Sequence, residues 1–233
     1  MKDLVQSRRT SAQMRQDVAA LRAQHGPALD AFHRIWYDAY FTHGMTYFEG
    51  VPLIKNPMDL WVYQELIFDL KPTLIIETGT AFGGSALFFA RQLEKLGAGS
   101  VVSVDISPAE QLPRHSRITF LPGSSIDPAI VALVANRARA HERVMVILDS
   151  DHGAEHVRAE LEAYAPLVTV GQFLVVEDTN INGHPVDIDW KGGPGPHAAV
   201  DAFLPEHPEF ERDVLAERYL LTMHPGGWLR RMR

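Results

Sequence analysis

The chain has 233 residues, enough for one α/β domain with an N-terminal elaboration, and 46% of them are hydrophobic, which excludes a disordered composition. Its formal net charge of −7 argues against nucleic acid or an anionic membrane surface as the main partner. The lack of cysteine excludes disulfides and thiolate zinc sites, and the apolar runs are too short for a signal peptide or a membrane span. We therefore expect a cytoplasmic protein.

The first 58 residues are predicted to form a unit of helices and a loop ahead of a domain over 59–233. Apolar residues recur at helical spacing through 1–42, where Val18 and Trp36 belong to the pattern. Such helices pack on a sheet or on another subunit, and we expect a homo-oligomer. Residues 43–59 combine Gly and Pro and predict a loop that ends where a helix over 59–69 begins.

From residue 73 onward, short apolar runs alternate with helical segments. The runs predicted to be strands are 73–77, 100–106, 117–123, 144–149 and 172–178. Apolar strands that alternate with helices predict a doubly wound, mostly parallel α/β sheet covered on both faces. A Gly/Pro-rich loop over 180–197 is long enough to be a lid, and a helix from 198 and an antiparallel hairpin over 218–232 complete the domain.

Four of the predicted strands end in acidic residues: Glu77, Asp105, Asp149 and the pair Glu177–Asp178. Because ligands of open α/β sheets bind beyond the carboxyl ends of the strands, these acids should converge on one binding edge. Crowded carboxylates are unfavourable unless cations or hydroxyl-rich ligands accompany them. The pattern therefore predicts a ligand site that holds cations or ribose hydroxyls.

A glycine-rich turn, Glu77-Thr-Gly79-Thr80-Ala-Phe-Gly83-Gly84-Ser85, follows the first strand. Its glycines let a ligand approach the backbone, and the next helix offers free N–H groups. The spacing E-x-G-x-x-x-G differs from the dinucleotide motif G-x-G-x-x-G, although such a turn alone also fits NAD binding or a plain tight turn. Asp105, at the end of the second strand, can accept both hydroxyls of a ribose.

The most specific pattern joins the fourth and fifth strands, which end in Asp149-Ser150-Asp151-His152 and Glu177-Asp178. The carboxylates of Asp149, Glu177 and Asp178 are hard ligands suited to Mg²⁺ or a similar ion. His152 can act as a general base beside that ion. In the alternative interpretation, an Asp caps the next helix with His152 on its first turn, and Asp151 could also replace Asp149 as first ligand.

These motifs resemble those of known methyltransferases. The glycine turn resembles the first motif of class I S-adenosylmethionine methyltransferases, and the metal and base arrangement resembles catechol-type O-methyltransferases. The chain is more similar still to the cephalosporin hydroxylase family, which includes rhamnosyl and other sugar O-methyltransferases. The similar stretches are KNPMDLWVYQELI, ETGTAFGGSALFFA, LDSDHGAEHVRAELEAYAPLV, VVEDTNINGHPV, GPGPHAAVDAFL and HPGGWLRR, from about residue 50 onward.

The resemblance implies a Rossmann-like class I methyltransferase fold, S-adenosylmethionine as cofactor and Mg²⁺ or another divalent cation. In such a fold the segment after the third strand holds the adenine, where Ser125 can bond its edge and Ile126 offers an apolar face, while Asp127 equally fits a helix cap. The residues expected at the cofactor are Glu77, Gly79, Thr80, Gly83, Ser85, Asp105, Ser124, Ser125 and Asp149.

The predicted reaction is metal-dependent methylation of a hydroxyl on a small molecule, a sugar or a glycosylated natural product of antibiotic type, with His152 removing the proton. Candidate contacts of the acceptor in the two loops are His43, Tyr47, Lys55, His184, Trp190 and His197. The alternatives are a hydroxylase or oxidoreductase acting on a β-lactam-type product, and a non-catalytic cofactor-binding protein. The sequence lacks a convincing 2-His-1-carboxylate iron triad, which argues against the first alternative.

Overall fold

The structure is a computed structural model that describes residues 11–39, 41, 44–188 and 193–233, so the predictions for His43 and Trp190 lie outside the described residues. The elements before the central sheet are α1 (Ser11–Asp38), β1 (Tyr47–Phe48), β2 (Val51–Pro52) and α3 (Pro57–Leu70). Those of the sheet and its covering layers are β3 (Leu74–Thr78), α4 (Gly84–Lys95), β4 (Ser100–Asp105), β5 (Ile118–Pro122), α5 (Pro128–Ala138), β6 (Val144–Leu148), α6 (Ala154–Tyr164), η1 (Ala165–Leu167), β7 (Phe173–Val176), α7 (Pro196–Phe203), β8 (Phe210–Arg212), η2 (Val214–Glu217) and β9 (Trp228–Arg231).

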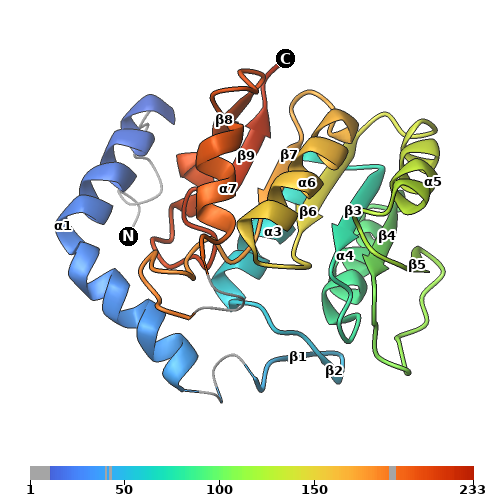
Figure 1. The fold of residues 1–233 in the computed structure, drawn as a ribbon, viewed down its shortest axis with the longest axis horizontal. Coiled ribbons are helices and arrows are strands. Elements are labelled where there is room, and N and C mark those ends of the chain that lie inside the picture. The colour runs from blue at the N-terminus through green and yellow to red at the C-terminus, as the bar shows by residue number, and fades with distance from the viewer. Residues whose placement is uncertain (1–10, 40, 42–43, 189–192) are drawn as a thin grey trace, which may run out of the picture.

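One seven-stranded sheet with the order β5-β4-β3-β6-β7-β9-β8 organises the chain (Figure 1). The strands from β5 to β7 are all parallel, and β9 and β8 add an antiparallel edge. This confirms the predicted doubly wound, mostly parallel sheet with an antiparallel hairpin near its C-terminal end. Each of the five predicted strands is present within two residues of its expected limits.

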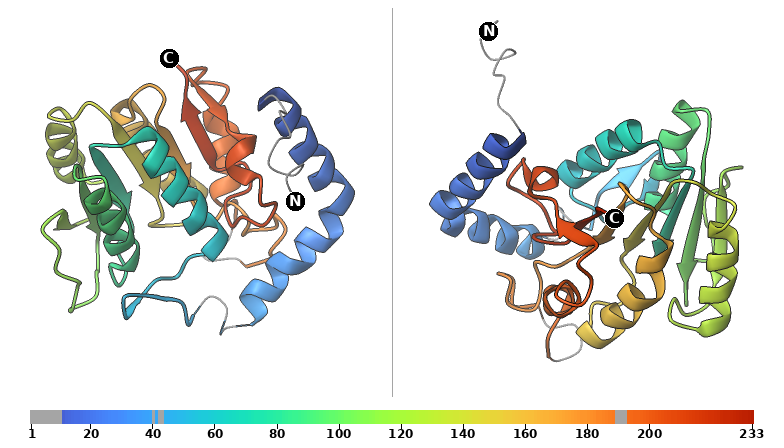
Figure 2. Two further views of the ribbon diagram at one scale, coloured as in Figure 1. Left: turned by 180° about the vertical axis from the view of Figure 1, so that it is seen from behind. Right: turned by 90° about the horizontal axis from the view of Figure 1, so that it is seen from above.

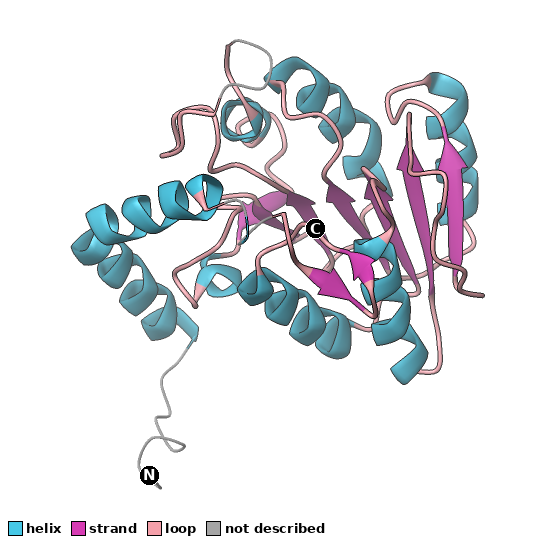
Figure 3. Cartoon of the chain, turned by 90° about the horizontal axis from the view of Figure 1, so that it is seen from below, coloured by secondary structure: helices cyan, strands magenta, loops and turns pink. Residues whose placement is uncertain are grey.

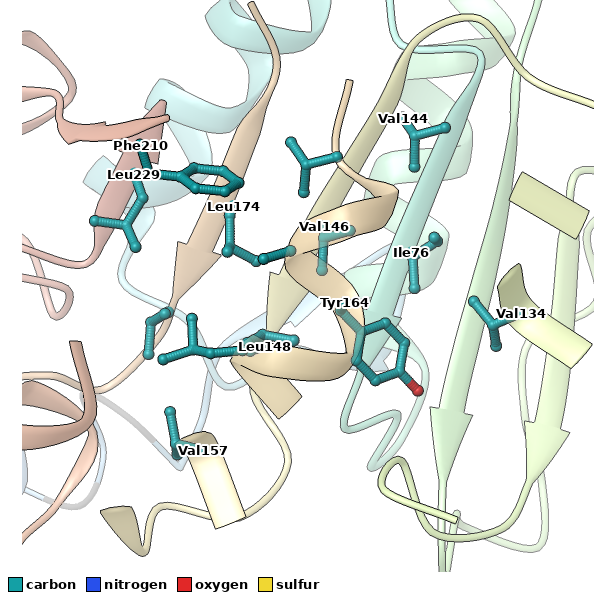
Figure 4. Packing of buried hydrophobic residues seen from close by; sticks show 14 of the residues in the cluster. Ile76, Val134, Val144, Val146, Leu148, Val157, Tyr164, Leu174, Phe210 and Leu229 are labelled. Carbon is teal, nitrogen blue, oxygen red and sulfur yellow. The ribbon is translucent and has the colours of Figure 1, made fainter. Parts of the chain in front are cut away.

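Helices cover both faces of the sheet, as the two further views show (Figure 2). On one face, α5, α6 and α7 pack over apolar residues of the strands, and Figure 4 shows Val146, Leu148 and Leu174 of this core with Tyr164 of α6. On the other face, α3 and α4 pack over a second core that includes Phe89. Burial on both faces explains why the strands read as continuous apolar runs.

The carboxyl ends of the central strands lie side by side at one edge of the sheet (Figure 3). Thr78 pairs with Val104 on one side and with Leu148 on the other, and Leu148 pairs with Val176. The next residue after each of these is Gly79, Asp105, Asp149 or Glu177. The strand order reverses at β3, which is the switch point where open α/β sheets bind their ligands.

The N-terminal helix α1 lies beside the antiparallel end of the sheet and runs toward its carboxyl edge (Figure 1). It contacts η2, where Arg22 pairs with Glu217 and Arg15 lies 3.9 Å from Asp213. The predicted loop over 43–59 contains the small β1–β2 hairpin and the first turn of α3. Asn56 caps α3 by accepting the N–H of Met58, and Pro57 follows at the first position.

The C-terminal hairpin differs in detail from the prediction over 218–232. Its first strand is β8, and residues 218–224 form turns instead of a strand. In this stretch the N–H of Met223 donates to the side chain of Asp59, to Oδ2 at 2.9 Å, instead of to a neighbouring strand. Among the helices of the described segments, none combines the length and apolarity needed to cross a membrane.

Candidate active site

The glycine-rich turn after β3 lies directly against the end of β6. Gly79 has a φ of +87°, and a Cβ on it would lie 1.8 Å from the carbonyl oxygen of Asp149. Its N–H donates to the carbonyl of Val104 at 2.8 Å, so the turn is tied to both neighbouring strands. Gly83, with a φ of +77°, closes the turn through a 2.7 Å bond to the carbonyl of Thr80. Only glycine fits the first of these positions without moving the backbone.

Asp105 holds this turn in place. One of its carboxylate oxygens accepts the N–H groups of Thr80 and Ala81 at 2.8 and 2.9 Å, and the other accepts the N–H of Ser107 at 2.7 Å. The carboxylate still lines the cavities described next, and the oxygen that accepts only Ser107 keeps a second lone pair for a ligand hydroxyl. Asp105 is therefore both a support of the turn and a candidate ribose ligand.

Two adjoining cavities lie at the carboxyl edge of the sheet. The smaller, of about 350 Å³, is lined by Ser124, Ser125 and Ile126 from the segment after β5. The larger, of about 660 Å³, contains the acids that end β6 and β7. Asp105, Ser150 and Asp151 line both cavities. The site thus has a half beside the predicted adenine residues and a half beside the predicted metal ligands.

Three of the predicted cofactor residues, Glu77, Thr80 and Ser85, are buried behind the turn. The hydroxyl of Ser103 donates to Glu77 at 2.6 Å and bonds Thr80 at 2.7 Å. Burial raises the pKa of Glu77 to about 7, against the opposing effects of the Lys55 charge and of hydrogen bonds from Ser103 and Ser85. These side chains support the turn from inside the domain.

A polar network that the sequence analysis did not single out borders the smaller cavity. His156 on α6 places Nε2 at 3.1 Å from the hydroxyl of Ser125 and at 3.3 Å from that of Ser150. Ser150 donates to the fully buried carboxylate of Glu160 at 2.6 Å, and Tyr164 donates to the carbonyl of Ser125 at 2.8 Å. The sequence signal for this network was the i, i+4 spacing of Glu160 and Tyr164, which places both on one face of α6.

The predicted metal ligands and the predicted base meet in the larger cavity. Asp149, His152 and Asp178 each place a ligand atom within 4.8 Å of those of the other two. His152 Nε2 lies 3.5 Å from Asp178 Oδ2. Asp151, the alternative first ligand, accepts the N–H of Gly153 at 2.8 Å and so marks the start of α6. The two carboxylates suit a divalent ion that keeps several waters, so the residues present fit the predicted metal, with the predicted base His152 beside it.

Glu177 is held differently from the other predicted ligands. It is buried, its Oε1 accepts the hydroxyl of Tyr63 at 2.7 Å, and its Oε2 accepts the ammonium of Lys55 at 2.5 Å. The same ammonium donates to Asp149 Oδ2 at 2.7 Å. Burial lowers the pKa of Lys55, but the charges of Asp149 and Glu177 outweigh it and raise that pKa above its usual value. Lys55 is therefore a buried cation that lines the larger cavity, where its contact with an acceptor stays a prediction.

His224 supports the acidic edge from the C-terminal side. Its Nδ1 accepts the N–H of Asp178 at 3.0 Å, which leaves the proton of the neutral ring on Nε2. Nε2 lies 3.7 Å from both Asp59 and Glu177, and burial lowers the pKa of His224. Asp178 has a φ of +52°, an unusual value for a non-glycine residue that this hydrogen bond helps to hold.

The remaining candidate acceptor contacts are spread over the two loops. His184 and His197 stack with ring centroids 4.2 Å apart, and His197 Nδ1 lies 3.3 Å from Asp201. Tyr47 is exposed on β1. Tyr37 of α1, which was not predicted, lines the larger cavity and donates to Asn180 Oδ1 at 3.2 Å. Residues from α1 and from both loops also line the larger cavity: Trp36, Ile54 and Ile188.

Known proteins are similar to this chain in sequence and in fold. The family model described as Rhamnosyl O-methyltransferase/CmcI matches residues 40–232. A protein named rhamnosyl O-methyltransferase from Mycobacterium leprae is 39% identical over 206 residues, covering 86% of this chain and 89% of the relative. Another of the same name from Mycobacterium tuberculosis strain H37Rv is 38% identical over 207 residues, covering 86% and 83%.

Two solved structures share the fold at lower sequence identity. One, titled CmcI-N160 apo-structure, has a TM-score of 0.61 at 21% identity and covers 81% of this chain and 76% of its own. The other, titled cmcI-D160 Mg-SAM, has a TM-score of 0.59 at 19% identity and covers 81% and 77%. The predicted class I methyltransferase fold and the predicted family are both confirmed. The chain belongs to the Rhamnosyl O-methyltransferase/CmcI family.

Proposed function

We propose that this protein transfers the methyl group of S-adenosylmethionine to a hydroxyl of a sugar with the help of a divalent cation. The sugar we propose first is a rhamnosyl group. The methyltransferase class follows from membership of the family. The sugar acceptor is inferred from the relatives of 38% and 39% identity, which are named rhamnosyl O-methyltransferases. The cation is inferred from the acids at the carboxyl edge of the sheet.

The observation that carries the proposal is the pair of adjoining cavities. S-adenosylmethionine supplies the methyl group when bound, and the glycine turn, Asp105 and Ser125 lie where its methionine, ribose and adenine parts are expected. The acids and His152 lie in the larger cavity, on the other side of the shared lining formed by Asp105, Ser150 and Asp151. We expect an acceptor hydroxyl in the larger cavity to lie beside the methyl group, and such positioning supplies much of the rate of group transfer.

The predicted ligands of the cation are Asp149, Glu177 and Asp178. Asp149 and Asp178 lie close enough to share an ion, whereas Glu177 is paired with Lys55. A divalent cation supplies positive charge that lowers the pKa of a nearby acceptor hydroxyl. An ion held by only a few carboxylates can take further oxygen ligands, and two neighbouring hydroxyls of a sugar could supply them.

His152 is the proposed general base. It precedes α6, and its Nε2 faces the carboxylate of Asp178 at 3.5 Å, which orients the ring. A neutral imidazole accepts a proton near pH 7. Aromatic and aliphatic residues that line the larger cavity, among them Trp36 and Ile188, reduce access of water. They thereby favour transfer of the methyl group to the sugar over side reactions with water.

The direct test is methyl transfer from S-adenosylmethionine to a panel of rhamnosyl glycosides, other glycosides, a catechol and a cephalosporin, with Mg²⁺ or with EDTA. We expect rhamnosyl glycosides to be methylated and EDTA to abolish the reaction. Full turnover in excess EDTA would refute the metal role, and transfer to the catechol or the cephalosporin alone would refute the sugar acceptor.

The hydroxylase alternative has weaker support. Within the described residues, the cluster that fits a metal has one histidine and two carboxylates, the reverse of the 2-His-1-carboxylate set of iron oxygenases. Turnover with Fe²⁺, 2-oxoglutarate and oxygen would show that this alternative is correct. A non-catalytic cofactor-binding protein would bind the cofactor and methylate none of the panel.

A further inference from the structure

A buried ammonium lies among the acids at the carboxyl edge of the sheet. Lys55 belongs to the short segment between β2 and α3, and only 5% of its surface is exposed. Its Nζ lies 2.7 Å from Asp149 Oδ2 and 2.5 Å from Glu177 Oε2, on two neighbouring strands. Lys55 thus bridges two of the three carboxylates that are predicted to hold the divalent ion.

The position of this ammonium matters because it binds carboxylate oxygens of Asp149 and Glu177, two residues that are also predicted to bind the divalent ion. Two carboxylates removed from water need a positive charge nearby, and Lys55 provides one. Glu177 has its second oxygen bonded to Tyr63, so each of its oxygens has a hydrogen-bond donor without a metal. Asp149 has one oxygen on Lys55 and also belongs to the cluster with His152 and Asp178.

We propose that Lys55 is a resident cation of the metal site, which competes with the divalent ion for Asp149 and Glu177. The inference rests on the proposed function, because it assumes that a divalent ion binds at this edge. It makes two consequences unavoidable. Part of the negative charge of the acids is neutralised when no ion is bound. Binding of an ion must overcome the positive charge of Lys55, so the ion is held more weakly.

A purely structural role for Lys55 gives the opposite expectation. If the ammonium only fixes the segment before α3, its loss loosens Asp149 and leaves ion affinity unchanged or lower. If it is a competing cation, its loss leaves two carboxylates that attract the ion more strongly. Even a well-screened unit charge within a few ångströms of a divalent ion changes its affinity by about tenfold.

The experiment is titration of the metal-free protein with Mn²⁺, followed by electron paramagnetic resonance of the free ion, without cofactor or acceptor. Four proteins are compared above neutral pH: the wild type, Lys55→Met, Lys55→Arg and Tyr63→Phe. Lys55→Met removes the charged nitrogen and keeps an unbranched side chain that is one atom shorter. Lys55→Arg keeps the charge, and Tyr63→Phe removes the other hydrogen bond of Glu177 while leaving Lys55 in place.

We expect Lys55→Met to bind Mn²⁺ about tenfold more tightly than the wild type, and the other two variants to stay within a few-fold of it. Equal or weaker binding by Lys55→Met would overturn the resident-cation role, as would equal tightening in Tyr63→Phe. Absence of Mn²⁺ binding in all four proteins would instead overturn the metal part of the proposed function.

Lys55→Met leaves the buried Glu177 and the partly exposed Asp149 without their ammonium, so its folding is followed by thermal denaturation with and without Mg²⁺. Recovery of the folded state on addition of Mg²⁺ supports the proposal, because the ion then replaces the missing ammonium. If Lys55→Met folds in neither condition, Lys55→Gln decides the question, since an amide can still donate to both carboxylates without a charge. Lys55→Gln should also bind Mn²⁺ more tightly, and failure to do so overturns the proposal.

Discussion

Replacing Gly79 with alanine tests whether the glycine turn and the end of β6 form one rigid unit. The added Cβ would lie 1.8 Å from the carbonyl oxygen of Asp149 and 2.5 Å from its carbonyl carbon. Real contacts of a Cβ stay above 3.0 Å, so the turn and the strand end must separate by at least 3.0 − 1.8 = 1.2 Å. The same displacement disturbs the cofactor turn and moves a predicted metal ligand.

Two costs contribute to the loss of stability in Gly79→Ala. An L-residue in a left-handed conformation costs about 1–2 kcal/mol, and over-packing of a tight contact costs about 1–3 kcal/mol. Gly171 provides a matched control because its φ is +86° and an added Cβ would have nothing within 4 Å. Gly171→Ala should therefore show the conformational cost alone.

The measurements are thermal denaturation and binding of S-adenosylhomocysteine by calorimetry. At roughly 2–4 °C per kcal/mol for a chain of this size, Gly79→Ala should melt about 2–12 °C below Gly171→Ala. It should also lose most of its affinity for S-adenosylhomocysteine, which Gly171→Ala should keep. If both variants melted together and bound the ligand equally well, the close approach of the turn to Asp149 would be refuted.

Three further outcomes are expected. His152→Ala should lower kcat about 10²–10⁴-fold with cofactor affinity unchanged, and a kcat within a few-fold of wild type would place the base elsewhere. Asp178→Ala should lose transfer activity yet keep the rise in Tm caused by S-adenosylhomocysteine; loss of that rise would show damage to the cofactor half. Because the pKa of Glu77 is raised by burial from 4.5 to about 7, the folded protein retains a proton that the unfolded chain releases, so stability falls as pH rises between those values. Glu77→Gln should lack this fall, which amounts to about 3 kcal/mol in the free energy of unfolding and is followed through Tm as a function of pH. Identical curves for the variant and the wild type would contradict the raised pKa of Glu77.

Much of the fold was predictable because it depends on local patterns. Short apolar runs, four of them ending in acids, located all five parallel strands, and the shared direction of those strands brought their ends to one edge. The nearness of Asp149 and Asp178, two of the three predicted metal ligands, to the predicted base His152 followed from the same geometry. These predictions need only the period of each element and the topology of a parallel sheet.

The parts that the sequence did not reveal are contacts between distant segments. Lys55 is 94 residues from Asp149 and 122 from Glu177, and a lysine in a predicted loop normally reads as exposed. His224 and Tyr37 reach the site from opposite ends of the chain. Their roles depend on how the hairpin and α1 pack, which no local pattern encodes. The homo-oligomer, the cytoplasmic location and the biosynthetic pathway stay predictions.

The tie between His224 and Asp178 has a consequence for the order in which the site is assembled. β9 pairs with β7, and the turn before β9 supplies the imidazole that fixes the backbone of Asp178. During synthesis the strands from β3 to β7 emerge before this segment, so the cofactor half can form first. The acidic half stays incomplete until residues 222–231 have docked. A nascent chain arrested before residue 222 should therefore recognise S-adenosylhomocysteine while lacking a competent place for the acceptor.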